Sequence, residues 1–156
     1  MKKQSGGFTL VEVMVVVVVV GLLAGVAIPS LMRSRLVSNE SIVQHDLKSV
    51  AAAAEIYRSS QIPPVYPPDL DTLGKGNIPI LDAAIAAGKQ HGYSFLFVSN
   101  AAGDGFGCVA NPLQYGATGN RSFCIDHQGI LRQYRAPVKT DGSGCVNNSS
   151  LISATP

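Results

Sequence analysis

Residues 6–12, Gly-Gly-Phe-Thr-Leu-Val-Glu, decide the fold together with the uninterrupted apolar segment that follows them at residues 13–28. About 20 apolar residues are enough to cross a hydrocarbon core roughly 30 Å thick. The valines at positions 15–20 are poor helix formers in water. In lipid, however, the backbone must satisfy its own hydrogen bonds, which favours a helix. The sequence therefore predicts a membrane-spanning helix over residues 8–32.

The charges around this segment indicate its orientation. Lys2 and Lys3 precede it, and the first acidic residue is Glu12; this asymmetry is typical of a cytoplasmic N-terminus. A secretory signal peptide, cut after Ala24 or Ala27, is the competing interpretation. It is disfavoured because the apolar segment continues into a second helical pattern. The net charge of +2 is too small to indicate nucleic-acid binding.

Glu12 is the residue whose position needs an explanation. A lone acid inside a membrane helix costs about 2.5–3.5 kcal/mol on insertion scales, so it needs a partner. No basic residue lies within reach in the same helix. Either Glu12 reaches the lipid headgroups, or it meets a positive charge on another molecule.

The run Gly7-Phe8-Thr9-Leu10-Val11-Glu12 resembles the class III signal of type IV pilins and type II secretion pseudopilins. The resemblance implies that a prepilin peptidase cuts between Gly7 and Phe8 and that Phe8 is then N-methylated. It implies that Glu12 pairs with the Phe8 amine of a neighbouring subunit during assembly. It also implies a helix kink at Pro29.

The same resemblance implies a pilin-like α+β fold, with one long helix packed on a small antiparallel sheet of three to four strands. The expected organisation is a leader, a transmembrane and assembly helix, an amphipathic continuation, a globular α+β domain and a C-terminal tail. The boundaries are 1–7, 8–32, 33–60, 61–135 and 136–156.

The amphipathic continuation is read from its periodicity. Leu36, Val43, Leu47, Val50, Ala54 and Tyr57 recur at helical spacing and predict one apolar stripe that packs on the globular part. We expect the opposite, solvent-facing side to carry Glu40, Gln44, Lys48, Glu55 and Arg58. The Pro-rich residues 62–68 end the helix, and short helical turns are expected at 69–74 and 79–88.

Residues 93–98, 106–111, 121–126 and 130–134 are predicted strands, because they are rich in aromatic and β-favouring side chains. A tight hairpin is expected at 127–129. From residue 136 the chain is rich in Gly, Ser and Asn and is expected to be loose unless tethered.

Three cysteines, Cys108, Cys124 and Cys145, predict one disulfide and one leftover thiol in an oxidising compartment. Cys108 and Cys124 are placed symmetrically about Gly116, which favours that pair if a hairpin turns there. A Cys124–Cys145 bond is the open alternative, and it would resemble the C-terminal disulfide loop of many type IV pilins.

No motif predicts catalysis, a metal or a cofactor. Residues 103–107, Gly-Asp-Gly-Phe-Gly, lack the spacing of a phosphate loop and a following helix, so a turn between strands is favoured. The histidines are isolated, and the cysteines lack zinc-site spacing. Arg121, Arg132, Arg135 and Lys139 form a mildly basic cluster, which we interpret as a solvated sheet edge.

The leading functional prediction is therefore a structural subunit of a type IV pilus, and the alternative is a pseudopilin of a type II secretion system. A membrane-anchored periplasmic enzyme or binding protein is a third hypothesis. The expected partners are further copies in a helical filament, prepilin peptidase, an inner-membrane assembly platform, minor pilins or pseudopilins, and the lipid bilayer before assembly. The expected location is the inner membrane, single-pass with a cytoplasmic N-terminus, and then a pilus or periplasmic filament.

Overall fold

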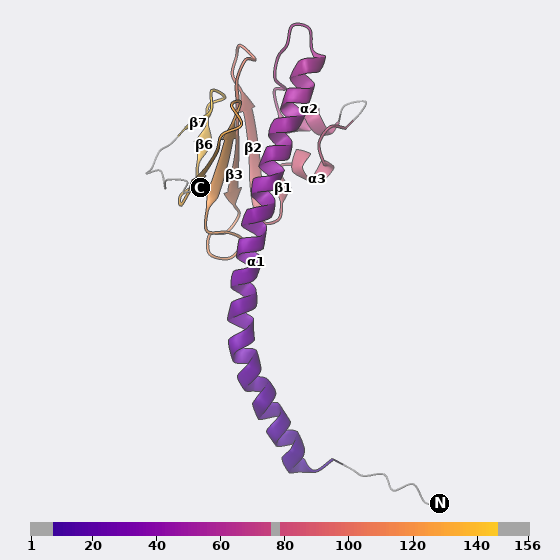
Figure 1. Cartoon of the computed structure of the whole chain (residues 1–156), viewed down its shortest axis with the longest axis vertical. Helices are drawn as coiled ribbons and strands as arrows, with labels where there is room; N and C mark the ends of the chain where they lie inside the picture. The colour runs from indigo at the N-terminus through magenta and orange to yellow at the C-terminus, as the bar shows by residue number, and fades with distance from the viewer. Residues whose placement is uncertain (1–7, 76–78, 147–156) are drawn as a thin grey trace, which may run out of the picture. The chain divides into compact units, whose positions relative to one another are not determined.

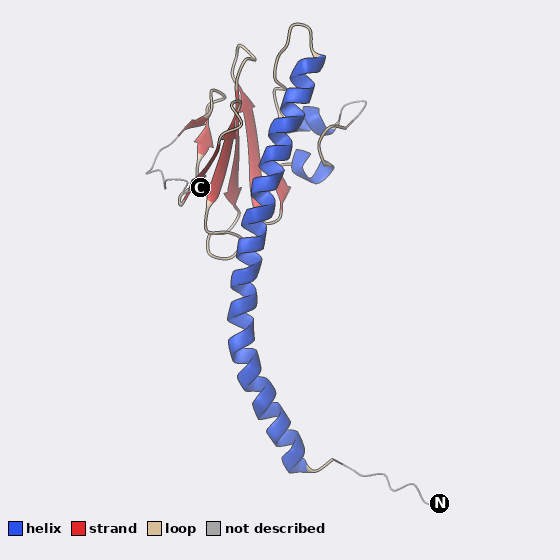
Figure 2. Cartoon of the chain, in the orientation of Figure 1, coloured by secondary structure: helices blue, strands red, loops and turns tan. Residues whose placement is uncertain are grey.

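The computed structural model describes residues 8–75 and 79–146. The predicted leader, including Gly7, and the last part of the predicted tail lie outside these residues. The chain divides into two compact units, Met1–Arg35 and Leu36–Pro156. Figures 1 and 2 show the elements, which are α1 (Leu10–Ser60), α2 (Leu70–Gly74), α3 (Ala83–Ala86), β1 (Lys89–Gln90), β2 (Tyr93–Ser99), β3 (Phe106–Pro112), β4 (Ser122–Asp126), β5 (Leu131–Tyr134), β6 (Lys139–Thr140) and β7 (Cys145–Val146).

In the first unit, the described residues form the beginning of α1. The helix starts within two residues of the predicted boundary at Phe8. Pro29 lies inside α1, and the helical assignment continues through it without a break. The kink expected at Pro29 stays a prediction.

The second unit is built on a five-stranded antiparallel sheet in the order β1-β2-β3-β4-β5. Strands β2 to β5 correspond to the four predicted strands. The β1 strand was not predicted, because two polar residues carry no alternating pattern. The α+β prediction is confirmed: the second half of α1 lies across one face of this sheet (Figure 1).

The core of this unit follows from the two periodicities. Val43, Leu47, Val50 and Ala54 of α1 are buried, as the helical stripe predicts. Alternate side chains of the strands meet them, because successive residues of a strand point to opposite faces. The strand residues on this face include Tyr93, Phe95, Phe97, Phe106, Cys108, Phe123 and Ile125.

Glu40 departs from the prediction of a solvent-facing side chain. It is only 3% exposed because Arg121, the last residue of the β3–β4 loop, reaches across to it. The Arg121 Nε donates to Glu40 Oε2 at 2.8 Å, and the backbone N–H of Asn120 donates to Glu40 Oε1 at 2.8 Å. Nearby, Asn39 Nδ2 donates to the Thr118 carbonyl at 3.1 Å. These bonds fasten the β3–β4 loop to α1.

Replacing Glu40 by alanine should lower the free energy of unfolding of this unit by about 3 kcal/mol. That is the lower end of the range for breaking a buried ion pair, because the Arg121 side chain is 42% exposed and regains water. Lys48→Ala, exposed on the same helix, should change stability by less than about 0.5 kcal/mol. Urea unfolding of the full chain in detergent micelles, followed by tyrosine near-UV circular dichroism, measures both. Equal effects would contradict the assigned role of Glu40.

The other face of the sheet is covered by the chain after β5. Val138 is buried there against Val109, Cys124 and Tyr134. The Asn111 side-chain amide donates to the Val138 carbonyl and accepts from the Val138 N–H, both at 2.9 Å. Residues 139–146 then form the β6–β7 hairpin. The described part of the tail is therefore tethered, which is the condition under which the sequence analysis did not expect it to be loose.

Two short helices and the Pro-rich connection complete the unit. Asp69 caps α2 by accepting the Thr72 N–H at 2.8 Å, and Asp82 caps α3 by accepting the Ala84 N–H at 2.8 Å. Tyr66, in the Pro-rich connection, is buried and donates its hydroxyl to Glu55 on α1. The two capping bonds of Asp69 and Asp82 explain why both predicted helical turns form, because each cap satisfies a free N–H at the start of its helix.

Candidate functional site

The predicted assembly residues lie at the start of α1. Thr9 is the cap of the helix: its Oγ1 accepts the Glu12 N–H at 3.2 Å, and its carbonyl accepts the Val13 N–H at 3.3 Å. Thr9-Leu10-Val11-Glu12 has the spacing of a capping box. Glu12 thus stands in the first turn, where the helix dipole favours a carboxylate. The sequence analysis missed this second role of the Thr-x-x-Glu spacing.

The helix that follows Glu12 exposes apolar side chains on all sides. Residues 13–20 are each between 48% and 64% exposed. Among the described residues, α1 is the helix that is long and apolar enough to cross a membrane. Contiguous apolar surface of this extent is not stable in water and indicates contact with lipid or with other proteins. Phe8 itself is 82% exposed.

Two glycines interrupt this apolar surface four positions apart. Gly21 and Gly25 lie on one face of α1, and a Cβ atom added at either glycine would have nothing within 4 Å of it among the described residues. The Gly-x-x-x-Gly spacing lets the backbones of membrane helices approach closely. The sequence analysis missed this feature, although the spacing is visible in the sequence.

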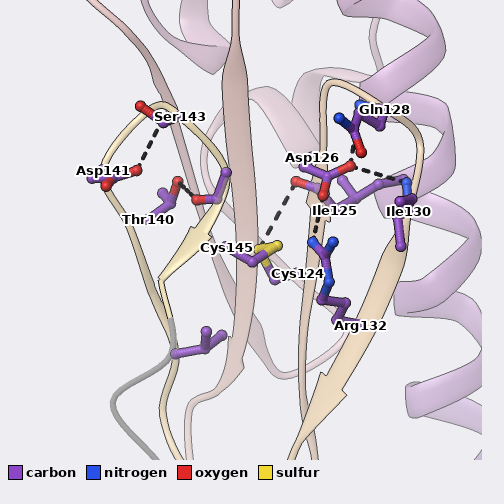
Figure 3. Close-up of a disulfide and its surroundings, with 12 residues drawn as sticks. Cys124, Ile125, Asp126, Gln128, Ile130, Arg132, Thr140, Asp141, Ser143 and Cys145 are labelled. Carbon is purple, nitrogen blue, oxygen red and sulfur yellow. Dashed lines mark hydrogen bonds and ion pairs between the residues drawn. A yellow bond between two sulfur atoms is a disulfide. The ribbon is translucent and has the colours of Figure 1, made fainter. Parts of the chain in front are cut away.

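The disulfide joins Cys124 to Cys145, with their Cα atoms 5.9 Å apart (Figure 3). The preference for Cys108–Cys124 is wrong, and the strand register explains why. Cys124 pairs with Val109, whereas Cys108 pairs with Ile125. Cys108 therefore faces α1 and Cys124 faces the opposite side of the sheet. Cys108 is left as a free, buried thiol.

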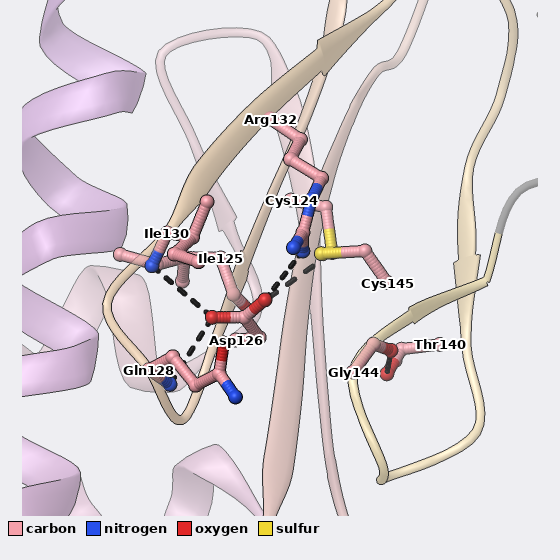
Figure 4. A network of polar contacts seen from close by, with 9 residues as sticks. All are labelled: Cys124, Ile125, Asp126, Gln128, Ile130, Arg132, Thr140, Gly144 and Cys145. Carbon is pink, nitrogen blue, oxygen red and sulfur yellow. Dashed lines mark hydrogen bonds and ion pairs between the residues drawn. A yellow bond between two sulfur atoms is a disulfide. The ribbon is translucent and has the colours of Figure 1, made fainter. Parts of the chain in front are cut away.

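A polar network lies next to the disulfide, at the β4–β5 turn (Figure 4). Asp126 is buried, and its Oδ1 accepts the N–H groups of Gln128 and Ile130 at 3.1 Å each. Its Oδ2 pairs with Arg132. Because the carboxylate is saturated by its own hairpin, the network shapes the turn predicted at 127–129. Arg121 and Arg132 of the predicted basic cluster are thus both engaged in ion pairs.

A third buried carboxylate, besides those of Glu40 and Asp126, belongs to Asp46 on α1. Burial raises its pKa above the ordinary value, while His91 and His45 act in the opposite direction. The sequence analysis gave these histidines no role. Among the described residues, no group of three or more His, Cys, Asp or Glu side chains could hold a metal ion. The exposed apolar helix at the N-terminus is the feature of the described residues that calls for a function.

Comparison with known proteins first shows which class of N-terminal segment this helix is similar to. Residues 2–28 match the family model described as the prokaryotic N-terminal methylation motif. The predicted cleavage junction, Phe8 and Glu12 all fall inside the match. The resemblance of the N-terminal segment to type IV pilins and pseudopilins is thereby confirmed.

More particular relatives match about a third of the chain. It is 39% identical over 57 residues to the type II secretion system core protein G of Pseudomonas aeruginosa, covering 36% of this chain and 40% of that protein. It is 35% identical over 57 residues to the core protein G of Aeromonas hydrophila, with the same coverage of each chain. The chain spans about two fifths of the length of these curated relatives. Among solved structures, a type IV pilin from Shewanella oneidensis is 20% identical with a TM-score of 0.40, covering 64% of this chain and 88% of that one.

These relatives bear on the choice between pilus and pseudopilus. The sequence analysis placed the type IV pilus first, whereas the sequence relatives are secretion proteins. They therefore support the alternative prediction, the pseudopilin, better than the leading one.

Proposed function

We propose that this chain is a pseudopilin-type structural subunit, which is processed at its N-terminus and polymerised through its N-terminal helix. The observation that carries the proposal is the match to the methylation motif at residues 2–28, followed by an apolar helix whose first turn holds a single carboxylate. The similarity to type II secretion core proteins G supports the secretion variant.

Before assembly, the helix at residues 8–32 spans the inner membrane with the N-terminus in the cytoplasm. Prepilin peptidase removes residues 1–7, and the Phe8 amine becomes the N-methylated terminus. A buried carboxylate and a buried amine are each costly in lipid, and pairing them relieves both costs. Glu12 of one subunit therefore pairs with the Phe8 amine of its neighbour. Assembly is then conditional on cleavage, because the amine does not exist earlier.

Withdrawal of the helix from the bilayer replaces lipid contacts by contacts with like helices. The assembly platform and minor pseudopilins are the expected partners in this step. The surface around Gly21 and Gly25 allows close helix approach. The unit at 36–156 supplies the outer surface of the filament, and its role in this proposal is structural.

A type IV pilus subunit is the second candidate. The observation in its favour is the Cys124–Cys145 bond, which resembles the C-terminal disulfide loop of many type IV pilins. The two candidates share the same N-terminal chemistry and differ in what the filament does.

Two measurements test the proposal. Intact-mass analysis of the chain from its native membrane should show loss of residues 1–7 and gain of one methyl group at Phe8. Deletion of the encoding gene should then block export of folded proteins while leaving surface pili in place. Loss of surface pili with normal export would establish the second candidate. An unprocessed N-terminus would overturn both and favour a membrane-anchored enzyme or binding protein.

A further inference from the structure

One end of the sheet in the second unit is formed by three neighbouring segments. Tyr93 pairs with Pro112, and Ser122 pairs with Tyr134, so the connections beyond these pairs all lie at the same end. We name this end of the sheet the basal end. It consists of the β1–β2 turn at residues 91–92, the β3–β4 loop at residues 113–121, and Arg135 after β5. It adjoins the point where the chain enters the unit, because Thr118 accepts a hydrogen bond from Asn39 of α1.

The loop of the basal end is ordered and presents apolar side chains outward. The Leu113 N–H donates to the Gly92 carbonyl at 2.9 Å, and the Tyr115 hydroxyl is hydrogen-bonded to Ser122. Leu113 is nevertheless 57% exposed and Tyr115 39% exposed. Tyrosine combines an apolar ring with a polar hydroxyl and is enriched at membrane–water interfaces, and an exposed leucine two positions before it adds apolar surface to the same loop.

Charge distinguishes the two ends of this sheet. Residues 112–119 carry no charged side chain, and the exposed cations Lys89 and Arg135 flank them. At the basal end, Glu40 is neutralised by Arg121. The other charged groups nearby are His91 and Asp82, which both lie within electrostatic range of the buried Asp46. The opposite end carries two acidic residues in its turns, Asp104 and Asp141, while Asp126 at that end is neutralised by Arg132. An anionic surface would therefore attract the basal end and repel the opposite one.

The length of the connecting chain brings the basal end within reach of a membrane surface. Asn39 follows Met32, the last residue of the predicted span, by seven positions. Seven residues of helix rise about 10 Å, and even a fully extended chain of that length spans at most about 25 Å. The headgroup layer on each side of the hydrocarbon core is about 5–8 Å thick.

We propose that the basal end rests on the anionic phospholipid surface of the membrane before assembly, with Leu113 and Tyr115 in the headgroup interface and Lys89 and Arg135 against lipid phosphates. This inference rests on the proposed function, because it requires the helix at 8–32 to be in the bilayer. The contact holds the second unit in one orientation on the membrane. It is released when the subunit is drawn into the filament.

The chain contains no tryptophan, so single substitutions give unambiguous fluorescent probes. Three variants of the full chain are reconstituted into phosphatidylglycerol vesicles whose lipids carry bromine atoms near the headgroup or deep in the acyl chain. Tyr115→Trp probes the basal end. Ile62→Trp is the matched control, because Ile62 is 99% exposed and lies in the connection that bonds the opposite end through Tyr66 and Gly103. Val17→Trp reports insertion of the apolar helix.

The fluorescence of Tyr115→Trp should peak at a shorter wavelength than that of Ile62→Trp. Bromines near the headgroup should quench Tyr115→Trp by a fraction similar to that by which deep bromines quench Val17→Trp. In zwitterionic phosphatidylcholine the quenching of Tyr115→Trp should weaken. If Tyr115→Trp stays unquenched while Val17→Trp is quenched, the docking proposal is overturned and the membrane function stands. If the emission of Tyr115→Trp is blue-shifted but not quenched, the basal end contacts a second subunit and not lipid, and the docking proposal is overturned. An unquenched Val17→Trp would overturn the proposed function itself. Formation of the Cys124–Cys145 bond, checked by mass, shows that each variant is folded.

Discussion

Cells that carry Glu12→Gln should assemble no filaments, although the peptidase still removes residues 1–7 from the chain. Glutamine keeps the shape of the side chain and removes its charge, so the attraction to the Phe8 amine of a neighbour is lost. Truncating one partner of a buried, hydrogen-bonded charge pair costs about 2–5 kcal/mol, which corresponds to more than a tenfold loss in association at each contact. Filaments repeat that loss at every subunit, so the expected result is their absence. Sheared filaments counted by electron microscopy, and the N-terminal peptide identified by mass, provide the two readouts.

The cap at Thr9 supplies the matched control for this experiment. The alternative explanation is that Glu12 only stabilises the start of α1, since Thr9 and Glu12 have capping-box spacing. Thr9→Ala removes the cap oxygen that accepts the Glu12 N–H and leaves the carboxylate in place. Filaments should therefore persist in Thr9→Ala. If both variants lose filaments equally, the helix start and not the intermolecular pair is responsible.

The second large effect is expected from the disulfide. Cys145→Ser should lower the free energy of unfolding by about 3 kcal/mol, because the bond closes a loop with a sequence separation of 21 and loops near this length are stabilised by about that amount. The strand and loop contacts of Val138 would remain, so the variant should still fold. Urea unfolding of the full chain in micelles, with and without reductant, measures the difference.

Three comparisons make that measurement specific. Reductant should destabilise the parent chain and leave Cys145→Ser unchanged. The double variant Cys124→Ser/Cys145→Ser should match the single one, since both lack the same bond. A Cys108→Ala variant that lost its response to reductant would instead show that Cys108 participates in the bond.

Local patterns were enough to predict the main elements of the fold. The stripe from Val43 to Ala54 and the four longer strands are set by the periodicity of apolar residues, which each segment carries by itself. Glu12 could likewise be identified from the sequence, because a single acid in an apolar helix is costly whatever the rest of the chain does.

The errors share one physical cause, which is dependence on register between distant segments. Whether Cys124 can reach Cys108 or Cys145 depends on which face of the sheet each occupies, and a shift of one residue exchanges the faces. The burial of Glu40 depends on Arg121, a residue 81 positions away in the sequence. None of these partners is visible within a local window.

Cys108 has a practical consequence that follows from its isolation. Its thiol is fully buried, and burial raises its pKa, so the reactive thiolate is suppressed in the folded unit. Because the sheet separates it from the Cys124–Cys145 bond, thiol exchange between the two requires the sheet to open. The rate at which an alkylating reagent modifies Cys108 therefore reports how often this unit opens. The native chain thus carries an internal probe of how often the second unit opens.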